Sequence, residues 1–150
     1  MSNGTAAQIY ACLQGYSEGS LGNYSKSIDI ANQILNHDPT NLDALELKAM
    51  SLIYLGKNNT ALTILNTLIS EGHVVPWVLD DRGVALLNLK NYVGAIANFD
   101  NALTLEPIDA YAFFNRAIAV LNLDLYSQQI YSLQQLQATW MFHNGNIITD

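Results

Sequence analysis

Apolar residues recur along this chain at intervals of three and four, and short polar stretches interrupt them at regular distances. The clearest stretch lies between residues 76 and 103, where the polar pair Lys90-Asn91 separates two runs with helical spacing. The first run is Leu79, Gly83, Leu86 and Leu87, and the second is Ala95, Ile96, Phe99, Ala102 and Leu103. This spacing predicts two amphipathic helices of about 12 to 14 residues joined by a turn. Alternation with a period of two persists nowhere, so no strand is predicted, and residues 144–150 are too few to assign.

The helical pattern repeats with a period of 34 residues. Segment 20–39 aligns with segment 88–107 over two periods, so that Asn23-Tyr24 falls on Asn91-Tyr92 and Pro39 on Pro107. An intermediate copy covers 54–73, and a more divergent fourth copy covers 122–141. Since proline is not tolerated inside a helix, Pro39 and Pro107 mark boundaries between units. A fixed period of this length indicates stacked helical hairpins.

These repeated positions resemble the tetratricopeptide repeat, whose 34-residue unit has small residues at fixed places, an aromatic residue in its second helix and a proline near its end. The third copy matches most closely, through Gly83, Leu86, Tyr92, Ala95, Phe99, Ala102 and Pro107. The resemblance covers about residues 8–141. It implies an all-α fold, a right-handed α-α superhelix of about four helix-turn-helix repeats. The expected organisation is a single domain, 1–150, with repeats at about 8–41, 42–75, 76–109 and 110–143 and a short tail, 144–150.

The end copies depart from the repeat pattern. Ser27 in the first copy and Gln129 in the fourth replace the alanine of the middle copies. The second helix of the fourth copy is rich in glutamine, through Gln128, Gln129, Gln134, Gln135 and Gln137. Because a solenoid must cover its terminal apolar faces, we interpret this helix as a polar cap; the alternative is a helix that has drifted from the pattern.

Composition and charge narrow the classes of function. Half of the 150 residues are apolar and 13% are charged, which predicts a folded, soluble domain, and no apolar run is long enough for membrane insertion. Six basic against thirteen acidic residues give a net charge of -7, which disfavours nucleic acid as a partner. The single cysteine, Cys12, excludes an internal disulfide. Residues 1–8 lack the pattern of a secretory signal, so a cytoplasmic location is the default expectation.

No pattern of catalytic, cofactor-binding or metal-binding residues emerges. His37, His73 and His143 fall at unequal places in the repeat and have no partner at metal-ligand spacing. Asp80 and Asp81 are adjacent on a predicted helix and therefore point in different directions, so they are not an acid/base pair. No Gly-x-x-x-x-Gly-Lys phosphate loop occurs. We therefore expect a protein that is not an enzyme and has no cofactor.

Two arginines, Arg82 and Arg116, lie one period apart. In the repeat family a basic residue near this position usually bridges helices. We therefore expect them to form salt bridges with neighbouring carboxylates such as Asp100 or Asp109.

The resemblance also implies where a ligand would bind, because stacked helix pairs form a concave groove lined by the first helix of each unit. The residues at those positions predict a groove with aromatic anchors, a stripe of carboxylates and apolar residues along its floor. No basic residue is among them. The predicted groove residues are Trp77, Tyr111 and Phe114, then Asp43, Glu46 and Asp80, then Met50 and Val84. The floor residues Met50 and Val84 have an alternative interpretation as ordinary packing between helices.

This groove composition predicts the class of partner. A repeat domain that grips a terminal carboxylate needs basic residues in the groove, and here those positions hold Cys12, Tyr16, Leu47, Trp77 and Asp81. The leading hypothesis is a protein–protein interaction scaffold that captures an apolar or amphipathic, basic peptide or helix. The alternative is a self-associating module, a homodimer that buries the groove and the apolar C-terminal segment 140–143 between copies.

Overall fold

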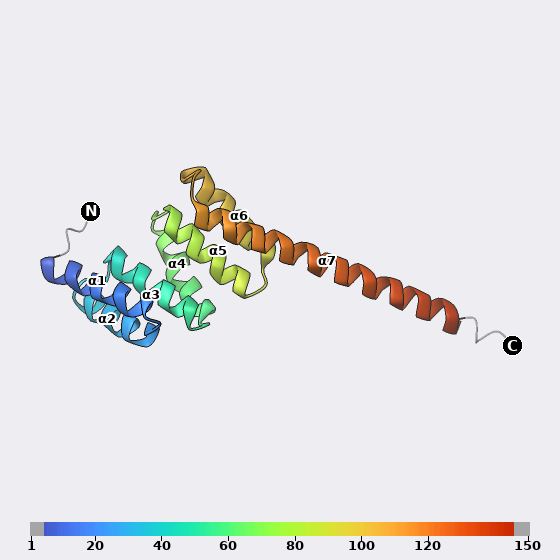
Figure 1. Ribbon diagram of the computed structural model, residues 1–150, viewed down its shortest axis with the longest axis horizontal. Coiled ribbons are helices and arrows are strands. Elements are labelled where there is room, and N and C mark those ends of the chain that lie inside the picture. Colours follow the sequence, from blue (N-terminus) through green and yellow to red (C-terminus); the bar gives the residue numbers. More distant parts are fainter. Residues whose placement is uncertain (1–4, 146–150) are drawn as a thin grey trace.

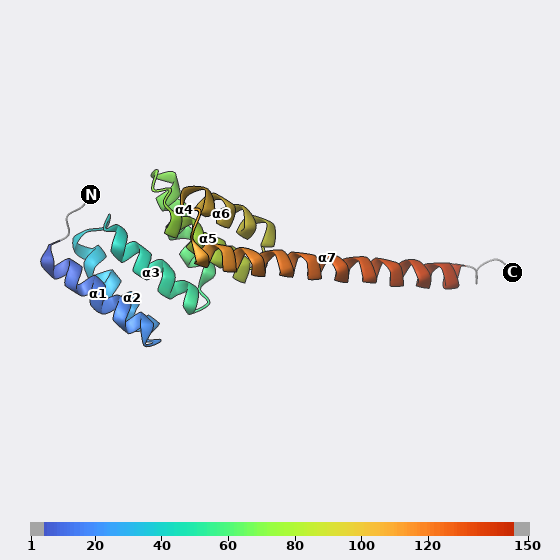
Figure 2. The ribbon, with the colours of Figure 1, turned by 45° about the horizontal axis from the view of Figure 1, so that its top comes forward.

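The computed structural model describes residues 5–145, and over that range it contains seven α-helices and no strand (Figure 1). The helices are α1 (Ala6–Ser20), α2 (Tyr24–His37), α3 (Leu42–Tyr54), α4 (Asn58–Ser70), α5 (Pro76–Asn88), α6 (Tyr92–Leu105) and α7 (Ala110–Gly145). The first six form three successive hairpins, and α7 packs on α5 and α6 through its N-terminal part only (Figures 1 and 2). None of the helices in this range is long and apolar enough to span a membrane.

The hairpins are stacked by translation rather than arranged around a closed centre. Each helix contacts the next along the chain, and the first helices also contact one another in order, α1 with α3, α3 with α5 and α5 with α7. Such contacts between neighbours define an all-α solenoid, as the 34-residue period predicted.

Polar residues and a proline define where several helices begin. The side chain of Thr5 accepts a hydrogen bond from the Gln8 amide while the Gln8 side chain accepts one from the Thr5 amide, which closes a capping box on α1. Asn41 and Asn91 accept from backbone amides at the starts of α3 and α6. Helix α5 begins at Pro76, whose fixed φ suits a first helical position.

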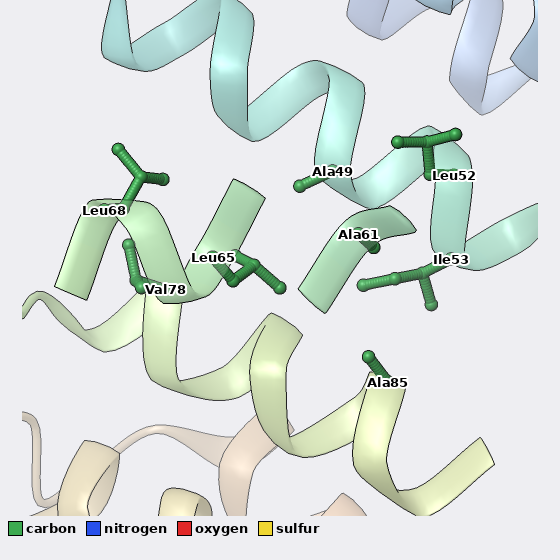
Figure 3. Close-up of a cluster of buried hydrophobic side chains, with 8 residues drawn as sticks. All are labelled: Ala49, Leu52, Ile53, Ala61, Leu65, Leu68, Val78 and Ala85. Atoms are coloured by element: carbon green, nitrogen blue, oxygen red, sulfur yellow. The ribbon is translucent and has the colours of Figure 1, made fainter. Parts of the chain in front are cut away.

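The core is a row of interfaces between neighbouring hairpins. Figure 3 shows the largest described cluster, in which α3, α4 and α5 bury Ala49, Leu52, Ile53, Ala61, Leu65, Leu68, Val78 and Ala85. A second cluster joins α5, α6 and the start of α7 through Leu79, Ala95, Phe99, Ala102, Ala112 and Ala119. Each fully buried leucine or phenylalanine contributes roughly 1.5–3 kcal/mol relative to exposure. Ser27, which replaces the alanine of the middle copies, is also fully buried.

The structure corrects the prediction for the fourth repeat. Each of the first three hairpins turns at a residue with positive φ, namely Gly22 (80°), Gly56 (73°) and Lys90 (63°), which lie 34 residues apart. One period further along, Asp124 and Leu125 supply neither a glycine nor the polar residue that follows it, and α7 continues without a turn for 36 residues. The fourth unit is therefore one long helix instead of a hairpin.

This continuous helix also overturns the interpretation of its glutamine-rich half as a cap. All residues from 124 to 142 are exposed, and this half of α7 extends away from the stacked hairpins (Figures 1 and 2). The helix runs through the expected start of the tail at 144, and residues 146–150 lie outside the described range.

One of the two expected arginine contacts is present. Arg116 on α7 forms a salt bridge with Asp100 on α6. Arg82 instead donates a hydrogen bond to the Asn98 side chain at 3.4 Å.

Candidate functional site

A hollow lies where α3, α5 and α7 meet. A cavity of about 420 Å³ lies there and is lined by Met50, Ile53, Tyr54, Asp81, Val84, Asn88, Tyr111 and Asn115. Met50 and Val84 lie one period apart, as do Tyr54 and Asn88, and Asp81 and Asn115. The cavity is therefore a product of the repeat, because equivalent positions on successive first helices face the same side of the solenoid.

Asp81 is the acidic residue that lines this cavity. Its Oδ2 atom is buried and has no hydrogen-bond partner. Desolvation raises the pKa of Asp81 from 3.8 to about 7, and the nearby carboxylates of Glu46 and Asp80 act in the same direction. An unsatisfied buried carboxyl oxygen is unfavourable by itself, so a donor or cation that enters the cavity would be stabilised there.

A second acidic group lies between α1 and α3. The exposed Asp43 and the half-buried Glu46 face Tyr16, whose hydroxyl donates to the Asp43 carbonyl oxygen at 3.5 Å. Desolvation and the Glu46 carboxylate, to which Tyr16 is also hydrogen-bonded, raise the pKa of Tyr16. Desolvation and Asp43 raise the pKa of Glu46, while its hydrogen bond with Tyr16 opposes that shift. Together with Asp81, these residues form an acidic stripe along the groove, defined here as Asp43, Glu46 and Asp81.

Cys12 lies at the same end of the groove but is not a reactive thiol. It is buried, and desolvation together with Asp43 and Glu46 raises its pKa above 9.0. Since the thiolate is the nucleophilic form, this environment suppresses its reactivity. Among the described residues, no group of three or more His, Cys, Asp and Glu side chains is placed to hold a metal ion.

The three predicted aromatic anchors occupy different environments. Tyr111 is 48% exposed and lines the cavity, and desolvation followed by the charge of Asp81 raises its pKa to about 12. Phe114, one turn further along α7, is 66% exposed and does not line the cavity. Trp77 is half-buried and packs against the cluster of α3, α4 and α5, so part of its surface belongs to the core.

Asp80 does not lie on the groove surface, where the sequence analysis predicted it. It is only 5% exposed, and its carboxyl group is hydrogen-bonded to Asp109, which caps α7 by accepting from the amides of Tyr111 and Ala112. Desolvation and Asp109 raise the pKa of Asp80 to about 7. Desolvation would raise the pKa of Asp109 as well, but its hydrogen bonds outweigh that effect and lower it. Asp80 thus bonds to Asp109 between α5 and the start of α7, and Asp81 takes the place of Asp80 on the acidic stripe.

The structure brings together only part of the predicted set. Met50, Val84 and Tyr111 meet at the cavity, and Asp43 and Glu46 lie beside it toward α1. Sequence reasoning did not assign Tyr54, Asn88 and Asn115 to the site. The signal that could have found these three residues is the period itself, because Tyr54 with Asn88 and Asp81 with Asn115 occupy equivalent repeat positions.

Parts of the chain are similar in sequence to known proteins. No family model matches the chain. Over 90 residues it is 32% identical to the DnaJ homolog subfamily C member 7 homolog of Dictyostelium discoideum, a match that covers 60% of this chain and 17% of that protein. The chain spans less than a quarter of the length of the curated relatives it matches.

Solved structures with similar folds are tetratricopeptide-repeat domains. The first such domain of human RPAP3 superposes with a TM-score of 0.73 at 20% identity, over 81% of this chain and 95% of that one. The first such domain of Spaghetti (RPAP3), bound to the HSP90 peptide SRMEEVD, superposes with a TM-score of 0.69 at 20% identity, over 78% and 93% of the two chains. This chain therefore has the tetratricopeptide-repeat fold that its repeated residues resemble.

Proposed function

We propose that this protein is an interaction module that binds a basic, amphipathic segment of a partner protein along the concave groove of α1, α3, α5 and α7. The observation that carries the proposal is the buried, unsatisfied Oδ2 atom of Asp81 in a cavity of about 420 Å³. A lysine or arginine side chain offers both parts that this cavity lacks, a charged donor for the carboxylate and an alkyl stem for the apolar walls.

The surrounding residues would each contact a different part of the bound segment. Met50 and Val84 form an apolar floor that contacts the stem, and Glu46 adds negative potential beside Asp81. Tyr111 and Phe114 are exposed aromatic side chains, which bury a large area at low entropic cost and are common among residues that dominate binding energy. Asp43, at the exposed end of the stripe, would steer a basic segment toward the groove.

The same charges argue against acidic ligands. The related domain of Spaghetti (RPAP3) binds a peptide with the acidic sequence SRMEEVD. In this chain no lysine or arginine lines the cavity, and a carboxylate placed beside Asp81 would meet a desolvated charge of the same sign. We therefore expect the groove of this protein to prefer the opposite charge.

Selection from an unbiased peptide library tests the proposal. A phage-displayed library of random 16-residue peptides is panned against the protein, and enriched peptides are labelled for fluorescence anisotropy. We expect enrichment of lysine or arginine next to aliphatic or aromatic residues. Enrichment of acidic peptides, or of none, would contradict the proposal.

Two variants then locate the binding. Asp81→Asn should weaken an enriched basic peptide about tenfold or more, which corresponds to at least about 1.4 kcal/mol. Glu71→Gln, at an exposed position at the end of α4 that does not line the cavity, is the matched control and should leave the Kd unchanged. Because a cation favours the ionised carboxyl, binding to the native protein should also tighten as the pH rises from 6 to 8 through the pKa of Asp81.

A further inference from the structure

The outer half of α7 carries an apolar stripe along one face, defined here as Tyr126, Ile130, Leu133 and Leu136. These side chains are between 38% and 66% exposed. Their spacing of four, three and three residues keeps them within a sector of about 120° around the helix axis, because each residue turns an α-helix by about 100°. The apolar stripe is therefore a continuous surface of the kind that packs against another helix.

The hairpins of the same chain end where the apolar stripe begins. The ring of Tyr126 contacts the ring of Tyr92, the first residue of α6, and the two ring centroids are 6.5 Å apart. Beyond this contact α7 extends away from the hairpins, and every residue from 126 to 142 is exposed (Figures 1 and 2). The apolar stripe lies on the same side of α7 as Ala112 and Ala119, which are buried in the second cluster. The packing face of α7 thus continues beyond the hairpins that cover it.

Charge indicates what kind of surface would cover the apolar stripe. Residues 125–142 contain no Asp, Glu, Lys or Arg, whereas the rest of the chain carries the whole net charge of -7. A covering surface must therefore be apolar, and charge on it would gain nothing from the stripe. A second copy of the stripe meets this requirement, provided that the acidic hairpins of the two copies stay apart.

Antiparallel pairing keeps the hairpins of two copies apart. A centre between Leu133 and Leu136 brings residue 143 of one copy level with residue 126 of the other, so the paired segments end where the hairpins begin. At about 1.5 Å per residue, the helix pair is then roughly 25 Å long, well beyond the screening length of about 8 Å at physiological salt. Parallel pairing would instead place the acidic hairpins side by side.

We propose that two copies of this chain form an antiparallel dimer through the apolar stripe, with the twofold axis between Leu133 and Leu136. Because the same surface is used by both copies, the contact is closed and stops at two. The stripe and the stems of Gln129 and Gln137, which are exposed on the same face, offer roughly 100 Å² per residue. Two copies then bury roughly 1,200 Å², the lower end for a specific interface, so the dimer should dissociate on dilution.

The dimer uses no residue of the proposed peptide groove. Tyr111 and Asn115, which line the cavity, lie in the part of α7 that packs on the hairpins, about three turns or more before Tyr126. Each copy in the dimer therefore keeps an open groove. Loss of the dimer would leave peptide binding intact, and loss of peptide binding would leave the dimer.

Cysteines placed along the apolar stripe test the orientation of the two helices. Leu133→Cys and Leu136→Cys each lie next to the axis, where the equivalent thiols of two copies can form a disulfide. On mild oxidation we expect each single variant to give a covalent species of twice the 16.5 kDa chain mass on a non-reducing gel. Tyr126→Cys should not, because its two copies lie roughly 25 Å apart in an antiparallel pair.

The matched control for cross-linking is Gln135→Cys, at an exposed position on the opposite face of α7. This variant and the native chain, whose Cys12 is buried, should remain at the chain mass. Cross-linking at 126 would indicate parallel helices. That result, cross-linking at 135 as efficient as at 133, or no cross-linking at 133 and 136 would overturn the proposal.

A charge placed in the apolar stripe provides a second test. Leu133→Glu puts a carboxylate from each copy at the centre of the contact and should convert the dimer to a monomer. Gln135→Glu adds the same charge on the opposite face and should remain dimeric. Light scattering over a concentration series measures the mass, and circular dichroism checks that the helical content is unchanged. A native chain that stays monomeric up to about 1 mM, or a Leu133→Glu variant that remains dimeric, would contradict the dimer.

Discussion

The ring of Phe99 lies against the backbone of Gly83 so closely that a Cβ atom at the glycine would be 2.6 Å from Cε1 of the ring. Phe99 is fully buried and belongs to the second cluster, whose other members are Leu79 and four alanines. This contact sets how near α5 and α6 can approach each other.

Gly83→Ala should therefore destabilise the fold although alanine is the better helix former. The methyl group would force the Phe99 ring to move, and such overpacking lowers the free energy of unfolding by about 1–3 kcal/mol, partly offset by about 1 kcal/mol of helix propensity. The matched control is Gly19→Ala in α1, whose Cβ would make ordinary contacts at 3.6 Å and longer and should be neutral or stabilising. Urea denaturation measures both, and equal stability of the two variants would refute the steric explanation.

Ala95 occupies the small position of α6 and is fully buried. Ala95→Leu should lower the free energy of unfolding by about 1–3 kcal/mol, because the larger side chain does not fit between the packed helices. Ala97→Leu, two residues away on the exposed side of the same helix, controls for the change in side chain alone. An unchanged melting temperature in the Ala95 variant would remove this residue from the core.

A buried chain of hydroxyl groups connects the first three helices. Ser51 donates to the Ser27 hydroxyl at 2.9 Å, and Ser27 donates to the Gly15 carbonyl oxygen at 3.0 Å. Ser27→Ala should destabilise the fold by about 1–3 kcal/mol, since it leaves the Ser51 hydroxyl buried without its acceptor. Adding Ser51→Ala should recover part of this loss, because both polar groups are then removed. A double-mutant cycle by denaturation measures the coupling, and strictly additive effects would contradict the network.

Because the carboxyl groups of Asp80 and Asp81 are buried, we expect the free energy of unfolding to fall as the pH rises from about 4 to about 7. The pKa values of Asp80 and Asp81 are raised to about 7 from 3.8, so in this window the folded chain retains protons that the unfolded chain releases. Asp81→Asn cannot ionise and should be more stable than the native chain at pH 8 by on the order of 1–2 kcal/mol.

The control for this pH effect is Asp29→Asn, at an exposed position on α2. Denaturation with urea at pH 5 and pH 8 gives the comparison. If the Asp81 and Asp29 variants respond to pH in the same way, burial is not the cause of the Asp81 effect.

The candidate site was only partly predictable from the sequence. The resemblance to the repeat family implied that the first helix of each unit lines a groove, and Met50, Val84 and Tyr111 meet at a cavity between α3, α5 and α7. The period could not decide between Asp80 and Asp81, because adjacent helical residues differ by about 100° in direction and the solenoid axis sets which of them faces the groove. Asp80 points instead toward Asp109 at the start of α7.

The sequence by itself determined the class of fold, the boundaries of the first three units and the excess of negative charge. These follow from local spacing, from proline and glycine, and from composition, all of which act along the chain. Only the tertiary structure decided that the fourth unit is a single helix and that Leu133 and Leu136 are exposed. The physical reason is that a side chain is buried only where a second surface covers it. The apolar residues of α7 are spaced as in a helix that packs on a neighbour. Because no turn occurs at Asp124, the second half of α7 does not fold back, and the rest of the chain does not cover its apolar side chains.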